Sequence, residues 1–545
     1  ERVMTATNRA TNRATNRTQT RALTRALTHP GVLTAVGVLV VWLAAAAALR
    51  SSDLVPYPWE LIRQIIDDRL LLTDHGGSTM ATALKGLVLG ILVVIPLAVI
   101  GLLWRPAEAV VMRIAVIIHV IPTVAVAPIL VVSLEGDYGR IVITALQVYF
   151  PALVGVIYGL RQADRRVLDV IHVAGGNSWQ GLVRVRLAAA APSIVSALQI
   201  AVPAAILGAL ISEFFGASKG LGVLLVNAQQ GFLIDRTWAI AVVVGLVATF
   251  GYGAVSLVGK WLVPWGSDEA SVGDAVAGAD AGRRSLLAST VSVLVTAVIL
   301  VGGWQSVLTG FDAEPFFTKG PVDVWRMMTE GNPGTGSTAG RFWSTFGDAL
   351  GQTLLDAGVG FVVGSVIAVA AAVALDSLPR VRAGVMPWAV VLRSVPMAAL
   401  TPLLVLLFGR GLGGVTVIVT LVTFFPTLVT VMQGLRAAPS GAVDVIRASG
   451  GGARQAVTRV KIIYAVPAMV AAARVAVPGA LAGATLAEWL ATGEGLGYML
   501  TLSSTNADYL QLWTAGILLA LVALVLHGVL GVIDRFVTRR LGAEL

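Results

Sequence analysis

The chain has 545 residues, of which 56% are hydrophobic and only 13% are charged, and its mean hydropathy is +0.83. A soluble domain carries about 25% charged residues, so the composition excludes an ordinary soluble protein and indicates a membrane protein. The absence of cysteine excludes disulfides and thiolate metal sites. The net charge of +9 lies in short loops between apolar runs, which favours orientation in a membrane over binding of nucleic acid.

The first half of the chain begins with a basic, low-complexity tail, residues 1–30, which we expect to be cytosolic. Six apolar runs follow, each long enough to cross a bilayer as a helix. The expected spans are 31–49, 82–104, 109–133, 140–160, 190–212 and 237–259. The polar stretch 51–77 should be extracytoplasmic, and its segment WELIRQIIDDRL predicts an interfacial helix. The 161–190 loop should be cytoplasmic, since its five arginines outnumber its two aspartates.

The second half repeats this pattern after a stretch without apolar runs, residues 264–284, which is rich in Gly, Ala and Asp and predicts a linker. Its expected spans are 285–303, 351–375, 384–408, 413–434, 467–488 and 511–533, and the chain ends inside with DRFVTRRLGAEL. The sequence therefore predicts an all-α polytopic membrane protein of about 12 transmembrane helices. We expect a first repeat at 31–263, a second repeat at 285–545, and both termini in the cytoplasm.

The two halves are related as copies at an offset of about 275 residues. VIPTVAVAPIL (120–130) matches SVPMAALTPLL (394–404), which pairs Pro122 with Pro396. AVPAAILGALISEFFGASKGLG (201–222) matches AVPGALAGATLAEWLATGEGLG (476–497), which pairs Glu213 with Glu488. Because each half has six expected spans, both halves have the same orientation, and the repeats are parallel about an axis along the membrane normal.

A polar cytoplasmic loop occurs twice at the same offset, as RQADRRVLDVIHVAGGNSWQGLVRVRLAAAAP (161–192) and RAAPSGAVDVIRASGGGARQAVTRVKIIYAVP (436–467). The equivalent residues are Asp169 and Asp444, Gly175-Gly176 and Gly450-Gly451, and Arg184 and Arg459. We expect a short helix that starts near the aspartate, a glycine turn that ends it, and a second amphipathic helix. The unit is either a knob for a partner's groove or an ordinary interfacial hairpin, and its strict repetition favours the knob.

This loop resembles the EAA loop of bacterial ABC-importer permeases, whose pattern is Glu-Ala-Ala, three residues, Gly, nine residues, Ile, one residue, Leu-Pro. Both copies here keep the spacing of six from the acid to the glycine. Val185 and Val460 fall on the Ile position, although Asp replaces the Glu and Val-Ile replaces the Ala-Ala. The segments from Glu213 and Glu488 to Gly-Leu-Gly resemble the branch that imports nitrate, sulfonates, taurine, bicarbonate and pyrimidine precursors.

The resemblance implies a type I ABC-importer fold and two permease domains, commonly separate homodimerising chains, fused here into one chain. It also implies a cytosolic ATPase dimer that grips both loops, and an extracellular or lipid-anchored binding protein that delivers the solute in a bacterial cell membrane. The chain has no G-x4-G-K-[S/T] phosphate loop. We therefore expect ATP and Mg to be bound by the partner, and no cofactor, metal site or catalytic residue in this chain.

Three kinds of residue are candidates for the translocation pathway. Glu213 and Glu488 are acids near the outer end of the fifth span of each half, where an acid is a functional candidate by default. They line or gate the pathway, or they accept a hydrogen bond that ties the helix end to the Gly-Leu-Gly turn. Arg474, where the first half has Gln199, either attracts an anionic solute or pairs with a buried acid or carbonyl. Pro122 and Pro396 are expected to kink pathway helices.

Two other functions are open at this point. An ion-gradient-driven secondary transporter with two six-helix halves also has 12 spans, but it predicts no doubled Asp-x5-Gly loop. A membrane scaffold or enzyme lacks support because no cluster of His, Asp or Ser has catalytic spacing. Of the solutes that the resemblance implies, we expect a small polar organic molecule, with sulfonate-like or carboxylate anions ahead of pyrimidine precursors.

Overall fold

The computed structural model describes residues 30–265, 286–310, 314–379, 381–385 and 396–540. The predicted tail (1–30) and linker (264–284) lie almost wholly outside these described residues. Within them, the chain is helical apart from turns and one short antiparallel hairpin, β1 (Gly331–Asn332) with β2 (Ser337–Thr338). The prediction of an all-α polytopic membrane protein is confirmed.

The first half consists of a peripheral helix, a helical core and short helices at both ends. The elements are α2 (Pro30–Ala48), α3 (Pro58–Asp67), α4 (Arg69–Leu103), α5 (Arg105–Val120), α6 (Thr123–Ser133), α7 (Tyr138–Arg161), α8 (Arg165–Val173), α9 (Ser178–Gly181), α10 (Leu187–Phe214), α11 (Leu221–Gln230) and α12 (Ile234–Leu262). A π-helical turn, Leu182–Arg186, joins α9 to α10 without a break.

The second half repeats this order. Its elements are α14 (Leu286–Gly310), α15 (Pro321–Thr329), α16 (Ala339–Ser377), α18 (Met397–Phe408), α19 (Leu412–Arg436), α20 (Ser440–Ala448), α21 (Ala453–Ala456), α22 (Ile462–Ala487), α23 (Gly495–Thr505) and α24 (Tyr509–Arg540). The π-helical turn Val457–Lys461 joins α21 to α22, at the position equivalent to the π turn of the first half.

The predicted spans are all represented by apolar helices. Among the described residues, eight helices are long and apolar enough to cross a membrane, and the bent pair of α5 and α6 makes a ninth candidate. The remaining predicted spans, 31–49, 285–303 and 384–408, correspond to shorter apolar stretches in α2, α14 and α18. Residues 386–395 of the last of these spans lie outside the described residues.

One predicted span has a different shape. The span expected over 109–133 is not one straight helix, because the chain bends by 94° between α5 and α6, next to Pro122, where the sequence predicts a kink. Ile121 precedes a proline, and the proline ring disfavours helical geometry at the residue before it. Ile121 accordingly has an extended conformation (ψ 123°), and Pro122 becomes the N-cap of α6. Pro396 is likewise the N-cap of α18.

The second span of each half begins earlier than expected. Helix α4 starts at Arg69 rather than near 82, and α16 starts at Ala339 rather than near 351. Polar residues at the start of α4 contact the turn before α11, which explains why this segment is ordered as helix rather than loop. Lys219 forms an ion pair with Asp74 at 2.6 Å, and His75 Nδ1 lies 3.0 Å from the carbonyl oxygen of Gly220.

Close helix contacts at glycine form the core of both halves. A Cβ atom on Gly86 of α4 would lie 2.3 Å from Thr144 Cβ of α7, and one on Gly360 of α16 would lie 2.4 Å from Val419 Cβ of α19. Small residues at helix interfaces let backbones approach in this way in membrane proteins. The equivalent pairs show that the two halves repeat in packing as well as in sequence.

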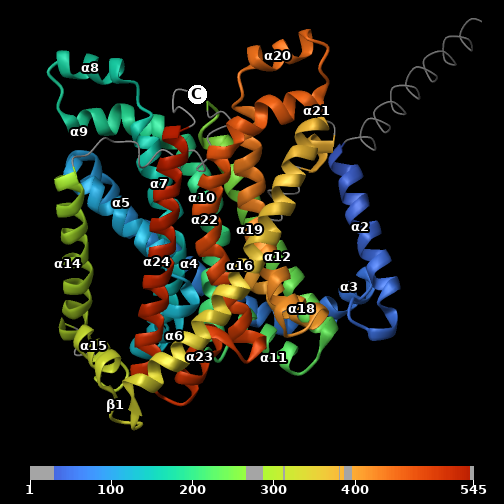
Figure 1. The fold of residues 1–545 in the computed structure, drawn as a ribbon, viewed down its shortest axis with the longest axis vertical. Coiled ribbons are helices and arrows are strands. Elements are labelled where there is room, and N and C mark those ends of the chain that lie inside the picture. Colours follow the sequence, from blue (N-terminus) through green and yellow to red (C-terminus); the bar gives the residue numbers. More distant parts are fainter. Residues whose placement is uncertain (1–29, 266–285, 311–313, 380, 386–395, 541–545) are drawn as a thin grey trace, which may run out of the picture.

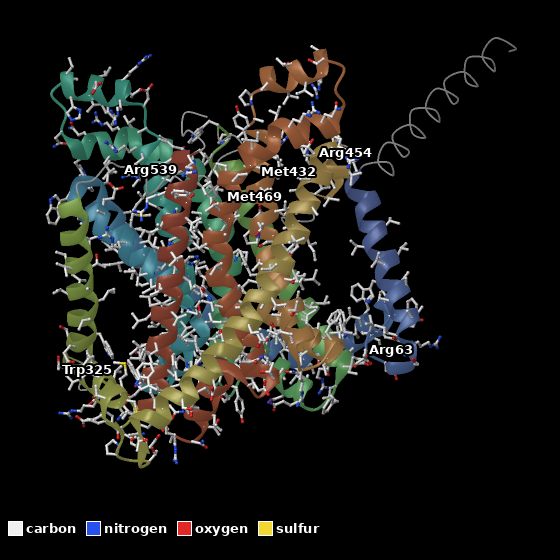
Figure 2. All side chains as sticks on the ribbon, in the orientation of Figure 1. Arg63, Trp325, Met432, Arg454, Met469 and Arg539 are labelled. Carbon is white, nitrogen blue, oxygen red and sulfur yellow. The ribbon has the colours of Figure 1, made fainter. Side chains whose placement is uncertain are left out.

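The halves interlock through their short central helices. Helix α6 of the first half packs against α22, α23 and α24, while α18 of the second half packs against α10, α11 and α12. Figure 1 shows α8 with α9 and α20 with α21 at one end of the molecule, and α11, α15 and α23 at the other. Figure 2 places Arg454 and Arg539 at the first end, and Arg63 and Trp325 toward the opposite end. The repeats therefore have the same orientation, as predicted.

Candidate functional site

The two repeated loops fold as the expected helix, glycine turn and helix. Helix α8 ends at a turn in which Gly175 has φ +80°, and the N–H of Gly176 donates to the carbonyl of Ile171 at 2.8 Å. Helix α20 ends in the same way, with φ +79° at Gly450 and a bond from Gly451 N–H to Ile446 O at 2.8 Å. This is the Schellman arrangement, which requires the left-handed conformation that glycine adopts without strain.

The second glycine of each pair is required by space rather than by backbone conformation. A Cβ atom on Gly176 would lie 2.4 Å from Ile171 Cγ2, and one on Gly451 would lie 2.6 Å from Ile446 Cγ2. In contrast, a Cβ atom on Gly175 or Gly450 would meet nothing within 4 Å. The pairs therefore combine one glycine that permits the turn with one that permits the close packing behind it.

The predicted aspartates lie elsewhere in their helices than expected. We expected the helix to start near Asp169, but Asp169 and Asp444 lie near the middle of α8 and α20. The residue that starts α8 is Asp164, whose carboxylate accepts the N–H of Arg166 at 2.9 Å as an N-cap. Asp169 and Asp444 are exposed, so they are available to a partner.

Each short helix has a single buried side chain, Leu168 in α8 and Val443 in α20, and packs against the helix that follows the glycine turn. Val170 and Val445, two residues further along each helix, are both exposed. Arg184 and Arg459 are exposed within the π-helical turns. The loops are therefore knobs that stand off the helix bundle at one end of the molecule (Figure 1).

At the opposite end, Glu213 joins three helices in a buried hydrogen-bond cluster. Its Oε2 accepts the N–H of Gly222 at 2.8 Å and the hydroxyl of Thr79 at 3.1 Å. The hydroxyl oxygen of Thr79 in turn accepts the N–H of Leu221 at 2.8 Å. The first turn of α11 is thus tied to both α4 and α10 by one carboxylate and one hydroxyl.

The second half contains the same cluster around Glu488. Its Oε2 accepts the N–H of Gly497 at 2.9 Å and the hydroxyl of Thr353 at 2.9 Å, and Thr353 accepts the N–H of Leu496 at 2.8 Å. In both halves the other carboxylate oxygen, Oε1, is buried without a hydrogen-bond partner among the described residues. The hydrogen bond to the Gly-Leu-Gly turn, which was one of the two sequence interpretations, is present in both halves.

The residues that follow the two glutamates meet at the seam between the halves. Trp489 stacks on Phe214 with ring centroids 5.4 Å apart and lies 4.5 Å from the ring centroid of Phe215. Ile211 and Leu486, one helical turn earlier, are buried in the same apolar cluster, which also includes side chains of α6 and α18. These side chains close the seam at the end of the fifth span of each half that lies opposite α8 and α20.

Arg474 pairs with an acid that the sequence analysis assigned to the cytosolic end of the chain. Its guanidinium lies 2.9 Å from the carboxylate of Asp534, which belongs to the last turns of α24. The ion pair joins α22 to α24, and the side chains are about one-fifth exposed (21% and 22%). The sequence had left open an anionic solute or a buried partner, and the structure provides the partner.

The remaining sequence candidates, Pro122 and Pro396, are buried at the starts of α6 and α18, where each half crosses into the other. Thr79, Thr353 and Asp534 also belong to these sites, although no motif in the sequence indicated them. The two threonines occupy equivalent positions of the repeat, so a pairwise alignment extended to the second span would have indicated them.

The fold is that of a polytopic membrane protein with two equivalent halves. The chain matches the family model "Binding-protein-dependent transport system inner membrane component" twice, over residues 86–265 and 360–542. The protein belongs to this family of ABC transporter permeases, and the two matches make it a fused double permease. Subunits of this family are transporters, so the chain is not an enzyme.

Known relatives each correspond to part of the chain. A probable ABC transporter permease of Haemophilus influenzae is 34% identical over 210 residues, which are 38% of this chain and 86% of the relative. The formylaminopyrimidine transport permease ThiX of Halalkalibacterium halodurans is 27% identical over 42% of this chain and 92% of its own length. A putative aliphatic sulfonates transport permease, SsuC of Bacillus subtilis, is 26% identical over 27% of this chain and 54% of its own length.

Proposed function

We propose that this protein is the transmembrane permease subunit of an ATP-driven importer for a small polar organic solute. The observation that carries the proposal is the pair of Asp-x5-Gly knobs, α8 and α20, which stand at the same end of a fused permease (Figure 1). A cytosolic ATPase dimer that binds ATP and Mg docks on these two coupling helices. Family membership favours this function over the ion-gradient-driven transporter, because permeases of this family act in binding-protein-dependent systems.

The names of two relatives indicate the chemical class of the solute. One relative is named for formylaminopyrimidine and another for aliphatic sulfonates. We propose a sulfonate-, taurine- or nitrate-like anion, or a pyrimidine-type precursor, handed over by an extracellular or lipid-anchored binding protein. In this assignment the chain lies in a bacterial plasma membrane with the coupling helices and both termini in the cytoplasm.

The outer gate of the pathway consists of the aromatic seam, Phe214, Phe215 and Trp489. Glu213 and Glu488 are positioning residues that fix the helix ends on which these rings stand. This role is supported by adjacency, since Phe214 and Trp489 directly follow the two glutamates, and by the rings that stack across the seam. Pro122 sets the bend that brings α6 into this cluster, and Pro396 is the N-cap of α18, which contributes to the same cluster.

Reconstitution tests the function directly. The chain should copurify with an ATPase subunit, and proteoliposomes that contain both, with the cognate binding protein, should take up solute when ATP is supplied. Uptake that persists after ionophores dissipate all ion gradients supports the proposal. Uptake that follows an imposed ion gradient without ATP would contradict it.

Variants of the coupling helices connect the function to the loops. Gly176→Leu and Gly451→Leu force a side chain into Ile171 and Ile446, so ATPase binding and ATP-driven uptake should be lost together. Gly528→Leu is the matched control, because a Cβ atom on Gly528 meets nothing within 4 Å. Full ATPase binding by the double Gly176→Leu/Gly451→Leu variant would show that the partner docks elsewhere.

A further inference from the structure

The two coupling helices expose apolar rows of different size. Val167, Val170 and Val173 follow one another at helical spacing on α8 and are all exposed, with Val173 at 90%. The equivalent positions of α20 carry Ala442, Val445 and Ala448. The central valines are matched, since Val170 is 67% and Val445 is 64% exposed. The difference therefore lies in two isopropyl groups, at 167 and 173, that α8 offers to a partner and α20 does not.

The charges beside these rows differ as well. Helix α8 begins with Arg165 and Arg166 and has one acid, Asp169, whereas α20 has Ser440 and Gly441 at its start. The acid of α20, Asp444, is already paired with Arg447 at 3.5 Å. The residue equivalent to Arg447 is His172, whose Nδ1 instead lies 2.9 Å from the carbonyl of Leu168. With the N-cap Asp164 counted, α8 carries two arginines and two aspartates and α20 carries one of each, so the helices differ in where their charges lie and not in net charge.

The first knob, formed by α8 and α9, also has more capping hydrogen bonds than the second, formed by α20 and α21. Asp164 caps the start of α8, whereas α20 follows Pro439 without a side-chain cap. After the glycine turn, Asn177 and Gln180 exchange two hydrogen bonds between side chain and backbone, at 3.2 and 3.0 Å. In the second knob only one of these remains, from Gly452 N–H to Gln455 at 3.2 Å. A capped helix loses less conformational freedom when it docks.

We infer that the two coupling helices bind the ATPase dimer unequally, with α8 as the main anchor and α20 as the weaker contact. The inference rests on the proposed function, since it assumes that both helices dock on ATPase subunits. The groove that receives α8 is apolar at its floor, where Val170 and Val173 enter. Two separate, identical permease chains would offer identical knobs, so a fused chain is what allows this division of roles.

A reciprocal swap at one position tests the inference. The probe is the ATPase subunit that copurifies with the unaltered chain, isolated and identified by its sequence, and the readout is its Kd for the full permease in lipid nanodiscs. Val173→Ala should weaken binding by about tenfold and Ala448→Val should tighten it by a similar factor, because two methyl groups are removed from or added to the buried contact. Both positions are exposed, so neither change disturbs the fold.

Aspartate variants of Val170 and Val445 distinguish a failure of this inference from a failure of the proposed function. Val170→Asp should abolish measurable binding, whereas Val445→Asp should leave weak binding. If neither change affects the Kd, the ATPase does not dock on these helices and the proposed function fails with the inference. If both weaken binding equally and the swap at 173 and 448 leaves the Kd unchanged, the proposed function stands and unequal anchoring is overturned.

Discussion

Phe215 of the first half lies against Trp489 of the second, with ring centroids 4.5 Å apart, at the seam where the two halves meet. Each ring stands within two residues of a buried glutamate, Glu213 or Glu488, whose carboxylate is bonded to a glycine turn in the same half. The closed seam therefore depends on interactions within each half as well as on contact between the halves. A change in either should alter the barrier to the solute.

Trp489→Ala should make the permease leak. An aromatic pair contributes about 0.5–1.5 kcal/mol beyond its buried area, and Trp489 contacts two rings, so the closed seam loses about 1–3 kcal/mol. A loss of 1.4 kcal/mol multiplies the open fraction about tenfold. Passive efflux of loaded solute from proteoliposomes without ATPase should rise by about that factor.

The control for this prediction removes a tryptophan pair away from the seam. Trp513 stacks on Trp304 with centroids 5.6 Å apart, between α24 and α14. Trp513→Ala should lower stability without increasing efflux. Efflux that is equal in the two variants would mean that Phe214, Phe215 and Trp489 are not the gate.

Glu488 should tolerate glutamine far better than alanine. Glutamine keeps an oxygen that accepts the N–H of Gly497 and the hydroxyl of Thr353, whereas alanine leaves both buried donors unpaired, at a cost of about 1–3 kcal/mol each. We expect Glu488→Gln to fold and transport, and Glu488→Ala to lose thermal stability and coupled uptake. The same contrast should hold at Glu213. Transport that falls equally in the Gln and Ala variants would show that the carboxylate acts as more than a hydrogen-bond acceptor.

The glycine turn beneath Glu488 leaves no room for a side chain. Gly495 has φ +86°, and a Cβ atom there would lie 2.2 Å from the carboxylate carbon of Glu488. Gly495→Ala combines left-handed strain with overpacking and should cost at least about 2 kcal/mol. Thermal unfolding in detergent measures this loss. Gly413→Ala, where a Cβ atom meets nothing within 4 Å, should leave the transition unchanged.

The glutamates and the glycine pairs of these sites were found from the sequence, whereas Thr79 and Asp534 were missed. Glu213, Glu488 and the two Gly-Gly pairs were visible because each occurs twice at a fixed offset. Thr79 was missed because the polar residues before it favour a loop, whereas contacts with the turn before α11 hold them in helix α4. Asp534 was missed because hydropathy places it beyond the last span, although α24 continues to Arg540. The pairing of Asp534 with Arg474 depends on a tertiary contact that no local pattern contains.

An ion pair between α12 and the start of α4 should make stability sensitive to acid. Arg236 donates two hydrogen bonds to the carboxylate of Asp68, at 2.7 and 2.8 Å, and these bonds lower the pKa of Asp68 from its ordinary value of 3.8. A group whose pKa is lower in the folded state stabilises the fold above its unfolded pKa. This contribution is lost as the pH falls through the folded pKa, so it is present at pH 5 and declines below pH 3.8.

The comparison with Asp68→Asn isolates this contribution. The variant should melt at a lower temperature than the unaltered chain at pH 5, and the difference in Tm should shrink as the pH is lowered below 3.8. A constant difference across this range would show that the ionised form of Asp68 is not what stabilises the contact. Asp67→Asn, at the neighbouring exposed position, controls for the general effect of removing a carboxylate.

The pair of Arg474 and Asp534 allows a test of whether the guanidinium serves the fold or the solute. Arg474→Gln and Asp534→Asn should each destabilise the protein by about 1–3 kcal/mol, because each leaves a charged partner behind. The double variant should lose less than the sum, since residues in contact are coupled, and the first half already carries Gln199 at the equivalent position. If Arg474 affects uptake only by pairing with Asp534, the double variant should have the same KM for uptake as the unaltered chain. A KM that stays raised in both Arg474→Gln and the double variant would instead assign Arg474 to an anionic solute.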